Sequence, residues 1–177
     1  KNWDALMLKI IQSGADVNAG DDSGSSAAGM AIDSGNVPGF RILCDNGLNL
    51  NFMEKGSEPL VMYAYRKNQK LIMNELLQRG ASLAARDSAG NTMLHAAAEK
   101  NDTAFFKSMQ QGSYDLNIKN SLGKTPLLVA VEKGSVAFAQ LLIADREHLD
   151  LGARDNQGMS LLHYLAPLKG GDKLLAM

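Results

Sequence analysis

One tripeptide in the chain has the residue types of a phosphate-binding loop. Gly123-Lys124-Thr125 are the letters with which many such loops close. The loop also needs a glycine five residues earlier, because backbone N–H groups must wrap the phosphates, and that position holds Ile118. The preceding segment, 110–117, is too polar for the buried strand that leads into a phosphate loop. The spacing therefore argues against a nucleotide site.

Other reactive side chains are present, but their spacing forms no recognisable catalytic or metal site. No two of the three histidines have the helical spacing of metal ligands. Cys44 lies at an apolar helical position, which is typical of a small core residue. No serine stands in a G-x-S-x-G turn, and "DDSG" and "DNQG" lack the glutamate that completes a calcium loop. We predict no enzyme activity, no cofactor and no metal for this segment.

Composition narrows the remaining function classes. The chain has 177 residues and a net charge of −1. Residues 1–58 carry 4 of the 18 basic and 8 of the 19 acidic side chains, leaving 14 and 11 for the rest. This weak polarity does not predict nucleic-acid binding, which needs clustered basic residues. No apolar run approaches the roughly 20 residues of a membrane helix, so we expect no membrane insertion.

The two ends of the sequence and its single cysteine predict the cellular compartment and the extent of the protein. One cysteine fits a reducing, cytoplasmic compartment, and no signal peptide is visible. The sequence begins with Lys1 rather than methionine, so we expect it to be a piece of a longer protein. We also expect a monomer.

The chain repeats itself with a period of 33 residues. The motifs "ADVN", "LNLN", "ASLA" and "YDLN" end at Asn18, Asn51, Ala84 and Asn117, and a fifth copy, "LDLG", ends at Gly152. A turn motif follows in step at 21–24, 87–90, 120–123 and 155–158. A third pattern follows that turn at 91–101, 124–134 and 159–167. Such a period predicts stacked structural repeats.

The best repeat shows what each motif does. Thr125 and Pro126 are residues that open a helix, since the threonine oxygen accepts free N–H groups and proline suits the first turn. An apolar stripe at helical spacing follows, and Gly134 can end the helix in a left-handed conformation. A second, more apolar helix is predicted over 136–144. The letters Gly-Lys-Thr then become a turn glycine, an exposed lysine and a helix cap.

These residues resemble the ankyrin repeat family, whose unit reads roughly D-x-x-G-x-T-P-L-H-x-A-A and ends in G-A-D-x-N. "SGADVN" (13–18), "GNTMLHAAAEKN" (90–101) and "GKTPLLVAVEKG" (123–134) match it closely, and the resemblance covers nearly the whole chain. It implies an all-α solenoid of helix-turn-helix units with projecting β-hairpin fingers. We expect one array, with units at 1–20 (partial, with a helix at about 3–13), 21–53, 54–86, 87–119, 120–154 and 155–177 (truncated).

Three places depart from the pattern. Gly56 comes one residue early, which predicts a local bulge with a longer helix after it. Two extra residues within 144–150 predict a surface loop. The last unit ends soon after the start of its second helix, at 169–177.

The resemblance also implies roles for particular residues. His95 and His163 stand at the T-P-L-H histidine, which in the family usually bonds backbone near the neighbouring turn; His148 lies in the inserted loop. Family partners usually bind at finger tips and at the exposed, concave face of the first helices. Mapped onto this chain, the predicted partner-binding residues are Phe52, Met53, Lys55, Tyr65, Arg66, Arg86, Glu99, Lys119, Leu122, Lys124, Glu132 and Tyr164.

Some of these residues have two readings. Phe52 and Met53 either present an apolar finger tip to a partner or fold back over the irregular unit. Tyr65 and Arg66 are either binding residues or packed and solvated ones. Asn51 occupies the position that asparaginyl hydroxylases modify in the family; it has a leucine eight residues before it but lacks the usual acidic residue two before.

The resemblance implies a protein–protein interaction module that binds another protein. An alternative is the targeting arm of an enzyme whose catalytic domain lies outside this segment, and a weaker one is a structural spacer or homo-oligomer. The degenerate repeats are similar in style to arrays of intracellular bacteria, which implies secretion into a host cytosol and a host protein as partner.

Overall fold

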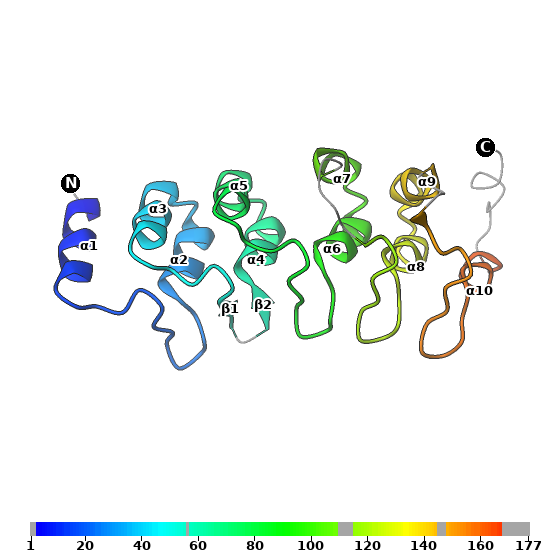
Figure 1. Ribbon diagram of the computed structural model, residues 1–177, viewed down its shortest axis with the longest axis horizontal. Coiled ribbons are helices and arrows are strands. Elements are labelled where there is room, and N and C mark those ends of the chain that lie inside the picture. The colour runs from blue at the N-terminus through cyan, green and yellow to red at the C-terminus, as the bar shows by residue number, and fades with distance from the viewer. Residues whose placement is uncertain (1–2, 56, 110–114, 145–147, 168–177) are drawn as a thin grey trace. The chain divides into compact units, whose positions relative to one another are not determined.

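The computed structural model describes residues 3–55, 57–109, 115–144 and 148–167. The chain forms two compact units, Lys1–Ser88 and Ala89–Met177. In each unit, pairs of short helices lie side by side and the turns between pairs extend from the same side of the helices (Figure 1).

Within residues 3–55 and 57–88, the first unit holds one single helix and two helix pairs. A short two-stranded antiparallel hairpin precedes the second pair, with Met53 opposite Pro59 and Glu54 opposite Glu58. The helix expected at about 3–13 is α1. The elements are α1 (Trp3–Gln12), α2 (Ala27–Ser34), α3 (Val37–Asp45), β1 (Met53–Glu54), β2 (Glu58–Pro59), α4 (Leu60–Arg66) and α5 (Lys70–Gln78).

The second unit holds two helix pairs and one short final helix in its described residues. Its elements are α6 (Met93–Lys100), α7 (Thr103–Met109), α8 (Pro126–Glu132), α9 (Val136–Ala144) and α10 (Leu161–Leu165). None of the helices in the described ranges of either unit has both the length and the apolar character needed to cross a membrane.

The predicted start and end of α8 are confirmed. The Thr125 hydroxyl oxygen accepts a hydrogen bond from the Leu128 N–H at 3.3 Å, and Pro126 is the first helical residue. Gly134 follows the helix with a φ of +71°, a left-handed conformation that costs glycine little.

The turn before α8 is also confirmed as a tight, self-bonded turn. The Asn120 side-chain oxygen accepts from the N–H groups of Leu122 and Lys124, each at 3.0 Å. Gly123 donates to the Asn120 carbonyl at 2.9 Å and has a φ of +75°. The expected finger strands are less regular than the turns: outside β1–β2 the described residues contain only isolated bridges, Gly20 with Ser26 and Arg154 with Ser160.

Neighbouring turns are joined by one recurring backbone hydrogen bond. An N–H in one turn donates to a carbonyl in the turn before it, at 2.8–3.0 Å, in four pairs: Lys55 to Gly24, Ser88 to Ser57, Ser121 to Ala89 and Asn156 to Leu122. The motif asparagines add a second link. The Asn18 amide donates to the Gly47 carbonyl at 3.0 Å and accepts from the Asn49 N–H at 2.7 Å. Asn117 makes the equivalent bonds to His148 and Asp150.

The core of each unit lies where second helices pack on first helices. In the first unit Phe40, Leu43 and Ile32 are fully or almost fully buried. In the second unit the rings of Phe106 and Phe138 meet edge to face with centroids 5.4 Å apart. The 33-residue period therefore places large side chains against each other across neighbouring pairs.

Three predictions fall wholly or partly on residues outside the described ranges. Gly56, around which the bulge was predicted, is one. The others are 145–147 of the predicted surface loop and the predicted start of the last second helix at 169–177. The described residues beside Gly56 form the β1–β2 hairpin, in which Lys55 has a φ of +51°.

Removing the Phe138 ring tests the core. Because this side chain is fully buried against Phe106, Phe138→Ala should lower the free energy of unfolding by about 3–5 kcal/mol. Urea titration followed by circular dichroism measures the change. Leu122→Ala, at an exposed turn residue, is the control and should stay within about 0.5 kcal/mol of the unmodified chain. Equal losses in the two variants would contradict the assigned core.

Candidate functional site

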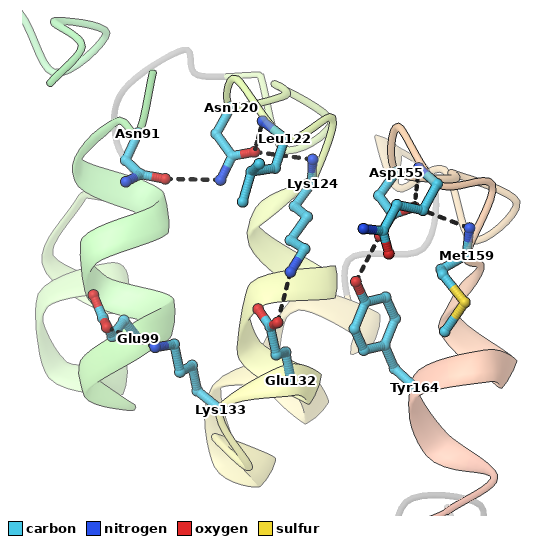
Figure 2. A network of polar contacts seen from close by, with 11 residues as sticks. Asn91, Glu99, Asn120, Leu122, Lys124, Glu132, Lys133, Asp155, Met159 and Tyr164 are labelled. Carbon is cyan, nitrogen blue, oxygen red and sulfur yellow. Dashed lines mark hydrogen bonds and ion pairs between the residues drawn. The ribbon is translucent and has the colours of Figure 1, made fainter. Parts of the chain in front are cut away.

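A polar network covers the exposed side of the first helices in the second unit (Figure 2). Lys124 lies just before α8, and its side chain runs along the helix to Glu132 at the other end, with Nζ 2.6 Å from Oε1. The Lys124 Nζ also lies 5.3 Å from the centre of the Tyr164 ring on α10. The side chain is only 13% exposed. The prediction of an exposed lysine is therefore wrong, because an acid and a ring from two elements cover it.

These contacts shift the pKa of Lys124. Partial burial disfavours the ammonium form, but the hydrogen bonds to Glu132 and Tyr164 outweigh it and raise the pKa of the lysine. The charge is therefore present throughout the neutral range and is held in one place. A charge fixed in this way loses less side-chain entropy when a partner binds it.

Tyr164 is held from its other end by Asp155. The tyrosine hydroxyl donates to Asp155 Oδ2 at 2.6 Å, and the aspartate is buried in the turn before α10. This bond, followed by those from the Met159 and Gln157 N–H groups, lowers the pKa of Asp155. Burial and the same bond raise the pKa of Tyr164. Asp155 was not predicted as a site residue, although it opens the "DNQG" turn motif.

Two further contacts extend this surface. Lys133, the C-cap residue of α8, pairs with Glu99 on α6 at 3.0 Å, and both side chains are about half exposed. Such pairs contribute little to stability, so both ends are available to a partner. Lys119 donates to the Arg154 carbonyl at 3.0 Å across adjacent turns. Leu122, at the tip of its turn, is 59% exposed.

The first unit presents a second cluster around Tyr63. Its hydroxyl donates to both oxygens of Asp33 on α2 at 2.9 Å. Lys67 pairs with Asp33 at 2.6 Å, and its Nζ lies 5.1 Å from the centre of the Tyr63 ring. The Lys55 ammonium lies over the same ring at 5.8 Å. The hydrogen bonds from Lys67 and Tyr63 lower the pKa of Asp33. Of this cluster, only Lys55 was predicted from the sequence as a site residue.

The predicted pair Tyr65 and Arg66 separates in the structure. Tyr65 is 7% exposed, which favours its packed alternative over partner binding. Arg66 is exposed and forms an ion pair with Glu58 at 2.8 Å. Successive helical side chains point in different directions, so the burial of Tyr65 does not require the burial of Arg66.

Phe52 and Met53 are half-buried. Phe52 lies close to Gly20 of the preceding turn, with its Cζ 3.6 Å from where a side chain at residue 20 would begin. Both alternatives for this pair therefore keep some support: part of each side chain packs and part reaches solvent. Arg86 and Asn51 are exposed. Partner binding at all these positions stays a prediction.

The histidines are structural where the contacts are described. The His95 Nδ1 lies 3.2 Å from the Thr92 nitrogen, and Nε2 lies 2.9 Å from the Lys124 carbonyl oxygen. His95 therefore bonds backbone of the neighbouring turn, as predicted. His163 makes the same first contact with Ser160 but is exposed. Cys44 is half-buried rather than in the core, and burial raises the pKa of its thiol.

Comparison with known proteins supports the repeat assignment. A protein-family model described as ankyrin repeats (3 copies) matches residues 2–87 and 94–172. No curated protein matches the chain significantly.

Cutting the Tyr164 hydroxyl tests the network. Tyr164→Phe should raise the pKa of Asp155 toward its ordinary 3.8, because its largest stabilising bond is lost. A lowered pKa in the folded chain stabilises it above 3.8, and that stability is lost as the pH falls below 3.8. The melting temperature of Tyr164→Phe should therefore fall less steeply below this pH.

Carboxyl-carbon NMR titration measures the pKa directly. Asp21, whose pKa is lowered by the Ser23 side chain in the other unit, is an internal control and should not move. An unchanged Asp155 pKa in Tyr164→Phe would show that the hydroxyl does not hold this carboxylate.

Proposed function

Because this chain belongs to the ankyrin repeat family, whose members are generally protein–protein interaction modules, we propose that it binds a partner protein through its turn tips and the exposed face of its first helices. Each unit contributes its own set of side chains. In the first unit these are Lys55, Arg66 and the exposed parts of Phe52 and Met53. In the second unit they are Glu99, Lys119, Leu122, Lys124, Glu132 and Tyr164.

One observation carries the proposal: charged side chains on this face are held in place by contacts between neighbouring repeats. Lys124 is fixed between Glu132 and Tyr164, and Lys67 between Asp33 and Tyr63. In each unit such a fixed charge needs little ordering on association, which favours affinity, and in the second unit the exposed Leu122 lies two residues before Lys124. Tyrosine and arginine, which dominate binding energy at many interfaces, lie among them.

The cytosolic location and a host protein as partner remain part of the proposal. They rest on the single cysteine and on the likeness in style to arrays of intracellular bacteria. Binding as a monomer is likewise proposed.

Paired variants test the surface. Lys55→Ala, Arg66→Ala, Lys119→Ala and Leu122→Ser together remove three cations and one exposed leucine from the proposed face. The control removes three lysines and one leucine from α1, α5 and α7: Lys9→Ala, Lys70→Ala, Lys107→Ala and Leu71→Ser, the last at a residue that is 70% exposed. We expect the first variant to bind a partner identified by affinity capture at least about tenfold more weakly, since hot-spot truncations exceed about 2 kcal/mol.

Binding affinity is measured by calorimetry with the purified partner, and circular dichroism confirms that both variants fold. The control should bind like the unmodified chain. An equal loss in both variants would place the interface elsewhere.

We also propose Asn51 as the hydroxylation site. It is exposed, and in the described residues its side-chain amide lacks the two backbone bonds that Asn18 and Asn117 make to the next repeat. An amide free of such bonds can enter an enzyme site without breaking a link between repeats.

Incubation with an asparaginyl hydroxylase and peptide mass spectrometry provides the test. One added oxygen is expected on Asn51, while Asn18 and Asn117 serve as matched controls within the same chain and should stay unmodified. Modification of the controls alone, or of no asparagine, would contradict the assignment.

A further inference from the structure

The first turns of helices α6 and α2 are built from different residues but make the same hydrogen bonds. In α6 the cap is Thr92, and the third helical residue is His95. The His95 Nδ1 lies 3.2 Å from the Thr92 nitrogen and 3.0 Å from its hydroxyl oxygen. The other ring nitrogen reaches the carbonyl of Lys124, the residue just before the cap of the next first helix. The histidine therefore closes its own helix and bonds the next repeat.

Helix α2 has glycine where α6 has histidine. Its cap is Ser26, and its third helical residue is Gly29. The place of the imidazole is taken by the carboxylate of Glu54, which belongs to β1 in the following repeat. The Ser26 N–H donates to Glu54 Oε1 at 3.2 Å, and the Ser26 hydroxyl donates to Oε2 at 2.6 Å. A Cβ atom at residue 29 would overlap this carboxylate, so a side chain there would displace the Glu54 carboxylate from its place.

We infer that Glu54 is the counterpart of His95 supplied from the next repeat, so that the contact between repeats runs in the opposite direction. The hairpin register supports this. Glu58 lies just before the cap of α4, as Lys124 lies just before the cap of α8, and Glu58 pairs with Glu54 in the β1–β2 hairpin. A histidine at residue 29 would reach this hairpin, as His95 reaches Lys124. In α2 the hairpin instead reaches back to the helix through Glu54.

As a consequence, the β1–β2 hairpin is held in one position. Glu54 is 1% exposed, and its neighbour Lys55 has a φ of +51° and donates its N–H to the Gly24 carbonyl at 2.8 Å. A carboxylate bonded at the start of α2 holds the hairpin against the preceding turn, where the positive end of the helix also favours a negative charge. Glu54 is therefore a positioning residue for the segment from Phe52 to Lys55. This inference goes beyond the proposed function, and its test needs no partner.

The test replaces the Glu54 contact at the start of α2 by a histidine contact of the kind found in α6. Glu54→Ala leaves the buried Ser26 N–H without its acceptor, so hydrogen exchange at Ser26 and Lys55 should accelerate at least about tenfold. Gly29→His alone should be destabilised, because its side chain overlaps Glu54. The double variant Gly29→His/Glu54→Ala should give Ser26 a histidine partner. The model for this contact is α10, where His163 bonds Ser160, another serine cap.

Backbone-amide exchange by NMR, together with the melting temperature, measures both effects. In the double variant, exchange at Ser26 and at Lys55 should both slow relative to Glu54→Ala, because the histidine rebuilds the cap and can bond the hairpin, as His95 bonds the Lys124 carbonyl. Glu99→Ala, at an exposed acid, is the control and should change neither amide.

Two results would overturn the inference. One is a double variant whose melting temperature falls by the sum of the two single losses or which fails to fold. The other is a Glu54→Ala variant that exchanges both amides at the unmodified rate. If Glu54→Ala fails to fold by itself, a folded double variant with a slowly exchanging Ser26 amide supports the inference.

Discussion

No helix pair in this protein can bury its apolar face by itself, and the structure of each unit depends on that constraint. The pairs are only seven to nine residues per helix in the complete repeats, too short to be stable alone. Burial is achieved by stacking one pair on the next, which places Phe106 against Phe138 across neighbouring pairs. The recurring N–H to carbonyl bond between adjacent turns then sets the register in which the pairs stack.

Because buried side chains and the backbone of the turns hold the repeats together, the outward side chains are free to vary. The outward face of the first helices lies outside the apolar core. Its charged side chains are nevertheless held in place by specific contacts. Tyr63 and Tyr164 each hold a lysine and an aspartate, in different units and from different positions in the repeat. An aromatic ring with one hydroxyl can contact a cation with its face and donate to an anion through the hydroxyl, which explains why the same arrangement recurs. The proposed binding surface is built from such fixed groups.

Much of the fold and part of the site could be predicted from the sequence. Thr125, Pro126, Gly134 and the Asn120 turn act through neighbours within about four residues, so their letters are sufficient. The bonds of His95 were also predicted, from the resemblance to a family in which this histidine bonds backbone near the neighbouring turn. The partial burial of Lys124 could not be predicted, because one of the side chains that cover it, Tyr164, lies forty residues later in the sequence. The burial of Tyr65 likewise depends on how α4 is rotated against its neighbours.

The sequence by itself determined the repeat, the helix caps, the turns and the membership of a family, since all of these follow from local hydrogen bonding and a period of 33 residues. Only the tertiary structure decided how departures from the repeat are accommodated. Nothing in the letters links Gly29 with Glu54, which lie 25 positions apart and belong to different repeats. They become one feature only when stacking brings the hairpin to the start of α2, where a missing side chain leaves room for an acid that must find hydrogen-bond donors.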